Sequence, residues 1–172
     1  EAVNKRICDH INENGFKGMG TTLALLFIKG MEAFVCNIGD SRVYLLRENE
    51  LKQITHDHTR LQSMIDFGLI NDEKEKGSYK AHVLTQHLGV FPEEFKLDPF
   101  MDRVSAKKDD VFILCSDGLT DMVTDEEIKE IIDDKRPLSQ SVRALVDAAL
   151  ARGVVEKRGS WIAYGTEQLG QL

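Results

Sequence analysis

The sequence predicts an α+β fold in which antiparallel strands are flanked by helices, and three observations lead to it. Short apolar runs follow one another at the regular spacing of an antiparallel meander, at 21–28, 32–38, 42–47 and 51–54. Apolar residues at helical spacing precede these runs at 2–11. Helix-start signals follow them, namely a capping box at 124–127 and Pro137.

Each element is expected for a local reason. The run at 21–28 is apolar on both faces, which predicts a fully buried strand, and Gly30 then marks a turn. A turn at 48–50 separates the next two strands. Beyond them we expect a short helix at 61–67, strands at 95–104 and 111–115, and helices at 124–132 and 138–151.

Composition narrows the class of protein. The length of 172 residues suits one domain, and no apolar run approaches the roughly 20 residues that cross a bilayer. The net charge of -7 argues against nucleic acid or an anionic membrane as a partner. The three cysteines form no CxxC pair and lie in apolar patterns, so we expect a reduced, cytoplasmic protein.

Two short acidic motifs each follow an apolar, strand-like run. Gly39-Asp40-Ser41-Arg42 follows 33–38, and Ser116-Asp117-Gly118 follows 111–115. A carboxylate at the exit of a buried strand is a rigid oxygen donor of the kind that Mg²⁺ and Mn²⁺ prefer. From these residues alone two other interpretations stay open. The first motif also fits a tight hairpin turn, and Asp117 also fits the N-cap of a helix beginning at Gly118.

Five segments together are more specific than either motif. They are GMGTT (18–22), GDSR (39–42), THDH (55–58), LTQHLG (84–89) and CSDGLTD (115–121). In this order and at these separations they resemble the bacterial metal-dependent serine/threonine protein phosphatases, over about residues 1–151. The resemblance implies a four-layer fold, two packed antiparallel sheets between outer helices. It also implies hydrolysis of phosphoserine and phosphothreonine on proteins by a water activated by Mg²⁺ or Mn²⁺.

The resemblance implies roles for five residues. Asp117 matches a ligand of the catalytic metal ions. Asp40 matches an acid that, with the equivalent of Asp117, holds a more weakly bound third metal ion. Thr21, Asp121 and Gly118 match supporting residues that orient ligands or backbone.

The histidines and the polar stretch at 68–82 are interpreted by the same resemblance. His56 and His58 flank Asp57 in a pattern that suggests a metal site, but in the family this segment lies in a loop leading to a flap. We therefore expect structural or surface roles for both histidines. The stretch at 68–82 matches the flap itself, which lies beside the catalytic cleft and affects substrate choice.

Two motifs of the family are missing from this sequence. The DGMGG segment, whose Asp and Gly bridge the two catalytic metals, should precede the first helix, and the DNIT strand should follow Gly153. We therefore expect an N-terminally truncated chain that binds Mg²⁺ weakly and is close to inactive alone. A sheet edge left without its leading strands predicts self-association. A non-catalytic, phosphatase-like binding domain is the alternative function.

The sequence of the C-terminal residues differs from what precedes it and predicts a separate segment. We expect a partial phosphatase-like domain at 1–152 and an atypical hairpin or tail at 153–172. Residues 153–171 resemble the end of the ATPase core of the bacterial recombinase RecA, so a recombinase-related fragment is a third function. The absence of a GxxxxGK[ST] loop excludes ATP-driven recombination. A fused or frame-altered terminus and a chance hairpin both stay open.

Overall fold

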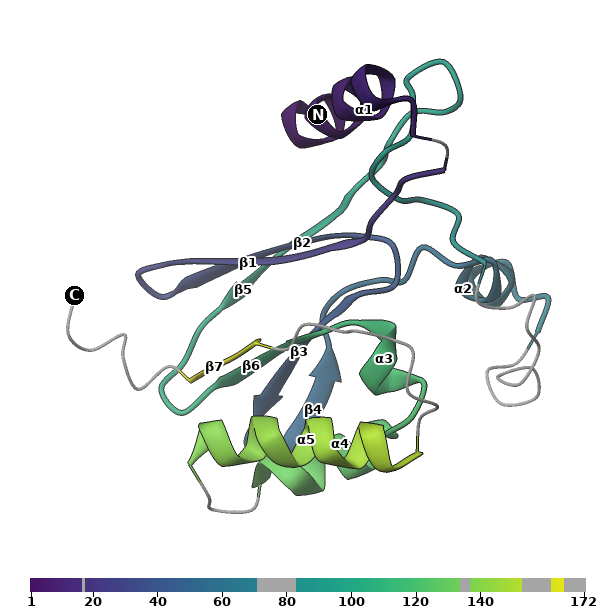
Figure 1. Cartoon of the computed structure of the whole chain (residues 1–172). Coiled ribbons are helices and arrows are strands. Elements are labelled where there is room, and N and C mark those ends of the chain that lie inside the picture. Colours follow the sequence, from purple (N-terminus) through teal and green to yellow (C-terminus); the bar gives the residue numbers. More distant parts are fainter. Residues whose placement is uncertain (17, 71–82, 134–136, 153–161, 166–172) are drawn as a thin grey trace. The chain divides into compact units, whose positions relative to one another are not determined.

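The structure is a computed structural model that describes residues 1–16, 18–70, 83–133 and 137–152 and the backbone of 162–165. Its elements are shown in Figure 1. The chain forms two compact units, each described below by itself. Unit 1 comprises Glu1–Leu23, Asn37–Asp40 and His56–Phe100, and unit 2 comprises Ala24–Cys36, Ser41–Thr55 and Met101–Leu172.

Nearly all strand residues lie in unit 2, where they form two sheets. The first sheet has the order β1-β2-β5, with bounds Leu23–Lys29, Glu32–Ile38 and Phe100–Ser105. The second has the order β4-β3-β6-β7, with bounds Glu50–Gln53, Arg42–Arg47, Val111–Cys115 and Ile162–Gly165. The β3–β4, β3–β6 and β6–β7 pairs are antiparallel. The α+β class predicted from the sequence is therefore confirmed.

The predicted single meander is wrong, because β2 and β3 belong to different sheets. The hairpin interpretation of the first acidic motif is wrong for the same reason. The chain turns at Gly39, which has a φ of 97° and packs against Thr22. The β3–β4 hairpin is confirmed. Glu48 and Asn49 both have positive φ, 50° and 65°, and form a two-residue turn between Arg47 and Glu50, which pair.

Strand β3 contributes to both hydrophobic cores of unit 2. Val43 and Leu45 pack with residues of both sheets in one core cluster. Tyr44 and Leu46 alternate with them and pack in a second cluster with the helices that flank the second sheet (Figure 1). These helices are α3 (Asp117–Thr120), α4 (Asp125–Asp133) and α5 (Leu138–Arg152). Unit 2 thus contains two packed sheets and one layer of helices.

The expectation that the strand at 21–28 is fully buried is wrong. Burial alternates along β1, and the side chains of Leu25 and Phe27 are 43% and 57% exposed. Ala24, Leu26 and Ile28 pack on the core cluster between the sheets. An apolar run therefore does not distinguish a strand buried on two faces from one buried on a single face.

The capping box predicted at 124–127 is confirmed. The Thr124 amide donates to Glu127 Oε2 at 3.0 Å, and the Glu127 amide donates to Thr124 Oγ1 at 3.3 Å. These bonds satisfy two amides at the start of α4. Arg152, the last residue of α5, donates to both carboxylate oxygens of Glu127 and so ties the end of α5 to the start of α4.

Unit 1 contains the two remaining helices. Helix α1 (Ala2–Asn14) covers the predicted helix and ends at Gly15, whose φ is 64°. Its Asn4 side chain accepts from the Gly89 amide at 2.7 Å and donates to the Val90 carbonyl at 2.8 Å. Helix α2 (Arg60–Asp66) confirms the short helix expected at 61–67. No helix within the described residues is long and apolar enough to span a bilayer.

The predicted C-terminal segment lies mostly outside the described residues. Within it, β7 pairs with β6, with Ile162 opposite Leu114. The predicted boundary at 152 and the RecA-like tail stay predictions.

Candidate functional site

The first and fourth of the five segments lie together in unit 1. The Thr21 amide donates to the Leu88 carbonyl at 3.1 Å, and the Leu88 amide donates back to the Thr21 carbonyl at 2.8 Å. Glycines permit this approach. A Cβ at Gly20 would lie 2.8 Å from His87 Nδ1, and one at Gly89 would lie 2.4 Å from the Met19 carbonyl oxygen. Thr21 is thus tied to Leu88 through its backbone, and the supporting role expected for it stays a prediction.

The second segment begins at a sharp turn, residues 37–40, which we call the 37–40 corner. A Cβ at Gly39 would lie 2.4 Å from Thr22 Cγ2, so the corner packs directly against the first segment. His58, from the third segment, donates its backbone N–H to the Gly39 carbonyl at 2.9 Å. The Gly39 amide in turn donates to His58 Nδ1 at 3.1 Å. Burial is the main cause that lowers the pKa of His58, which favours a neutral ring.

The third segment also contacts the fourth. The Thr85 amide donates to the His58 carbonyl at 2.9 Å, and Thr59 forms an isolated antiparallel bridge with Leu84. Unit 1 therefore joins residues from four of the five segments through backbone hydrogen bonds and close packing. Asp40 lies at the end of the 37–40 corner and is half-buried.

The fifth segment lies in unit 2, directly after β6. Ser116 is the N-cap of α3, and Asp117 is the first residue of this four-residue helix. The interpretation of Asp117 as an N-cap is therefore wrong, because the helix begins one residue earlier than that interpretation requires. Asp117 and Gly118 are half-buried, while Asp121 is exposed and its amide donates to the Asp117 carbonyl at 2.8 Å.

The register of unit 2 relates the two acidic motifs. Arg42, the first residue of β3, is paired with Cys115, the last residue of β6. Because the strands are antiparallel, Ser41 and Ser116 leave the same end of this pair.

Arg42 is held by a short hydrogen-bonded chain. Its Nη1 donates to the Tyr44 hydroxyl at 2.8 Å, and that hydroxyl donates to Asp125 Oδ1 at 2.9 Å. Tyr44 is fully buried, and burial is the main cause that raises the pKa of its hydroxyl. The hydroxyl therefore stays protonated and links the start of β3 to the start of α4.

The described residues fit part of a divalent-cation site. Asp40 and Asp117 each offer a half-buried carboxylate next to the end of a strand, which suits Mg²⁺ or Mn²⁺ chemically. Within the described ranges, however, no three His, Cys, Asp or Glu residues gather into a group that could hold a metal ion. Asp40 belongs to unit 1 and Asp117 to unit 2.

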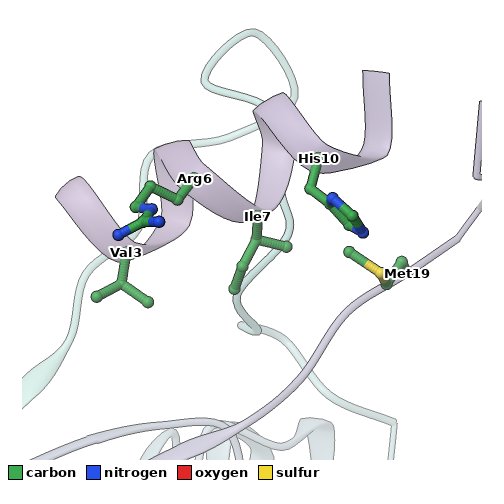
Figure 2. A pocket seen from close by; sticks show the side chains of 5 residues that line it. All are labelled: Val3, Arg6, Ile7, His10 and Met19. Carbon is green, nitrogen blue, oxygen red and sulfur yellow. The ribbon is translucent and has the colours of Figure 1, made fainter. Parts of the chain in front are cut away.

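Two hollows are found among the described residues of unit 1. One, of about 380 Å³, is lined by Ile7, His10, Met19 and two further residues of α1 (Figure 2). In Figure 2 the His10 ring and the Met19 side chain point toward one another. The other, of about 720 Å³, lies beside the segments at 18–22 and 84–89. Neither is lined by Asp40 or Asp117.

Comparison with known proteins identifies the family. The sequence model described as protein phosphatase 2C matches residues 1–157. The chain belongs to the protein phosphatase 2C family. This confirms the resemblance drawn from the five segments, which all lie within the matched residues.

Individual relatives of this phosphatase 2C chain support the same family assignment. Serine/threonine phosphatase stp of Listeria welshimeri is 34% identical over 154 residues, which make up 89% of this chain and 60% of that protein. The structure of the Mycobacterium tuberculosis serine/threonine phosphatase PstP/Ppp matches with a TM-score of 0.80 and 34% identity, over 87% of this chain and 62% of that one. The PstP catalytic domain in complex with two manganese ions matches with a TM-score of 0.79 and 33% identity, over 93% and 65%.

The chain spans about 60% of the length of the first curated relatives it matches, and the fold is that of the family. Sequence reasoning placed the acidic residues at strand ends but missed the contact of His58 with the 37–40 corner. No sequence signal marks this contact, because its partner Gly39 lies 19 residues away. The family resemblance implied only a structural or surface role for His58.

Proposed function

We propose that this protein takes part in the hydrolysis of phosphoserine and phosphothreonine esters on phosphorylated proteins, with Mg²⁺ or Mn²⁺ as cofactor. The observation that carries the proposal is the register of β3 with β6 in a chain of this family. Ser41 and Ser116 leave the same end of that strand pair, and Asp40 and Asp117 are their neighbours in the chain. Carboxylates on rigid strand ends suit hard cations beside a phosphate ester.

In this proposal Asp117 is a ligand of the catalytic metal ions, and Asp40 and Asp117 contribute to a weaker third site. When bound, such ions supply a water of lowered pKa and neutralise charge on the phosphoryl group. Thr21, Gly118 and Asp121 support the site through the backbone. The bridge of Thr21 to Leu88 and the hydrogen bond of Asp121 to the Asp117 carbonyl are consistent with these roles.

We further propose that hydrolysis is impaired in this chain taken alone. Support comes from the described residues, in which no three potential ligands gather, since a single carboxylate holds Mg²⁺ weakly. The same observation favours a second candidate function, a phosphatase-like domain that binds phosphoproteins without hydrolysing them.

Manganese titration tests the role of Asp117. We expect weak binding of Mn²⁺ to this chain by calorimetry, and a severalfold further loss in Asp117→Asn, because the substitution removes the negative charge and one anionic oxygen donor. Asp147→Asn is the matched control, since Asp147 is exposed on α5 in the same unit. Equal binding by wild type and Asp117→Asn would contradict the assignment of Asp117 as a ligand.

A phosphate-release assay with a phosphothreonine peptide and Mn²⁺ accompanies this titration. We expect release by this chain to be close to the uncatalysed rate. Rapid release that Asp117→Asn abolishes would support hydrolysis and contradict impairment. Peptide binding without Mn²⁺ binding or release would favour the binding-domain alternative.

We also propose that the chain self-associates through β1. This strand is an edge of the three-stranded sheet, runs for seven residues and contains no proline. Edge strands of this kind present unpaired backbone groups to a second copy.

Sedimentation velocity tests this edge. The average mass of wild type is expected to rise with concentration, and Leu25→Lys is expected to reduce the rise because a charge on an edge strand opposes pairing. Leu150→Lys is the control, since Leu150 is exposed on α5. A constant mass of one chain, or an equal effect of both substitutions, would contradict pairing through β1.

A further inference from the structure

We propose that His58 is a positioning residue whose imidazole holds the 37–40 corner, and thereby Asp40, in the geometry needed to bind a divalent cation. The inference rests on the proposed function, because it takes Asp40 to be a metal ligand. It gives a role to a histidine for which the sequence predicted only a structural or surface location.

The first support is the two-point contact between His58 and Gly39. The His58 amide donates to the Gly39 carbonyl at 2.9 Å, and His58 Nδ1 accepts from the Gly39 amide at 3.1 Å. Both backbone polar groups of Gly39, its N–H and its carbonyl, are therefore bonded to one residue. Since Asp40 is the next residue, this contact restricts the direction in which its side chain leaves the backbone.

The second support is that Gly39 lies, along the chain, between two strands that belong to different sheets. Strand β2 ends at Ile38 and β3 begins at Arg42 in the other sheet, so Gly39 is not part of a strand ladder. Gly39 is buried, and a buried amide without a partner costs about 1–3 kcal/mol. The ring nitrogen of His58 takes the place of the carbonyl that a neighbouring strand would supply.

The third support is Asn37, which is fully buried beside the same contact. Its Nδ2 donates to the Gly39 carbonyl at 3.1 Å and to the His56 carbonyl at 3.0 Å. Gly39 thus accepts from both Asn37 and His58, and the segments at 37–40 and 56–58 are held at fixed spacing. Thr22 packs against Gly39 and prevents the corner from relaxing in that direction.

Two substitutions of His58 distinguish the effect of its acceptor nitrogen from the effect of the volume of its ring. His58→Phe keeps an aromatic ring but removes the acceptor. His58→Asn offers an amide oxygen close to the place of Nδ1 and is expected to restore the bond. His56→Phe is the matched control, because the His56 side chain is hydrogen-bonded to Asp66.

The first measurement is hydrogen exchange of the Gly39 amide by NMR in the metal-free chain. We expect exchange to be roughly tenfold faster in His58→Phe, near the wild-type rate in His58→Asn, and unchanged in His56→Phe. If His58→Phe does not fold, ¹⁵N NMR of the wild-type His58 ring tests the contact instead. The proposal requires Nδ1 to be the unprotonated ring nitrogen, because it accepts from the Gly39 amide. An unchanged Gly39 exchange rate in His58→Phe, or a protonated Nδ1 in a neutral ring, would overturn the proposal.

The second measurement is paramagnetic broadening of the Asp40 amide signal during Mn²⁺ titration. We expect His58→Phe to require more Mn²⁺ for equal broadening and His58→Asn to recover most of the difference. Broadening at the wild-type Mn²⁺ concentration in His58→Phe would overturn the link to metal binding. If Asp40 is not broadened in wild type while Gly39 exchange responds as expected, the proposed metal role of Asp40 fails and the contact itself stands.

Discussion

Replacing Asp110 with alanine is expected to lower the free energy of unfolding of this chain by about 3–5 kcal/mol. Asp110 is 1% exposed and accepts from Arg47 Nε at 2.8 Å, Arg47 Nη2 at 2.7 Å and the Lys107 amide at 2.8 Å. Asp110→Ala leaves the Arg47 guanidinium, which is 25% exposed, without its carboxylate. Urea unfolding followed by circular dichroism measures the loss.

Two further variants distinguish the loss of the buried Arg47–Asp110 contact from the loss of a negative charge alone. Asp109→Asn removes the neighbouring exposed carboxylate and keeps a residue that tolerates the φ of 67° found there, so we expect little change. Adding Arg47→Met to Asp110→Ala is expected to recover part of the loss, because it removes the unpaired charge. If Asp110→Ala were as stable as wild type, the Arg47–Asp110 pair would not be the main stabilising contact at the C-terminal end of β3.

The same pair predicts how stability depends on pH. Burial alone would raise the pKa of Asp110, but the hydrogen bonds from Arg47 and the Lys107 amide outweigh it, so the pKa lies below its usual value. A carboxyl whose pKa is lower in the folded chain contributes stability above its unfolded pKa of about 3.9. The difference between wild type and Asp110→Ala should therefore be constant near neutral pH and shrink as pH falls below about 4.

Gly89→Ala is expected to destabilise unit 1 by about 2–5 kcal/mol, from a strained backbone and a forced displacement. Gly89 has a φ of 94°, and an added Cβ would lie 2.4 Å from the Met19 carbonyl oxygen. Backbone atoms cannot yield as a flexible side chain can, so the segments at 18–22 and 84–89 must separate. Faster hydrogen exchange of the Thr21 and Leu88 amides would report this separation.

Gly30→Ala is the control for backbone conformation. Gly30 also has a positive φ, 59°, but nothing lies within 4 Å of an added Cβ. We expect a loss of about 1–2 kcal/mol there, without a change in Thr21 or Leu88 exchange. Similar losses and similar exchange in the two variants would mean that φ alone determines the need for glycine at 89.

The sequence predicted individual elements better than their assembly. The strands at 32–38 and 42–47 have the bounds expected from their apolar patterns, and the turn between β3 and β4 follows from Glu48 and Asn49. The division of these strands between two sheets was implied only by the family resemblance, while the local patterns predicted a single meander. It depends on the contacts of Gly39 with Thr22 and His58, which no local pattern encodes.

For the candidate site, too, the sequence predicted some features and not others. A carboxylate after an apolar run was sufficient to predict that Asp117 follows a strand, and the structure places it directly after β6 and the N-cap. The role of Asn37 in fixing the backbone near Asp40 could not be predicted, because its sequence context is that of any polar residue within a strand. Its function depends on which carbonyl groups tertiary packing brings to its amide.

Strand β3 has a consequence for how the molecule unfolds. Its odd-numbered residues Val43 and Leu45 belong to one apolar cluster, and its even-numbered residues Tyr44 and Leu46 belong to the other. Melting of either cluster would expose one side of this strand to water and remove support from the opposite side. Neither cluster can then be lost independently, and the two should melt in a single cooperative step.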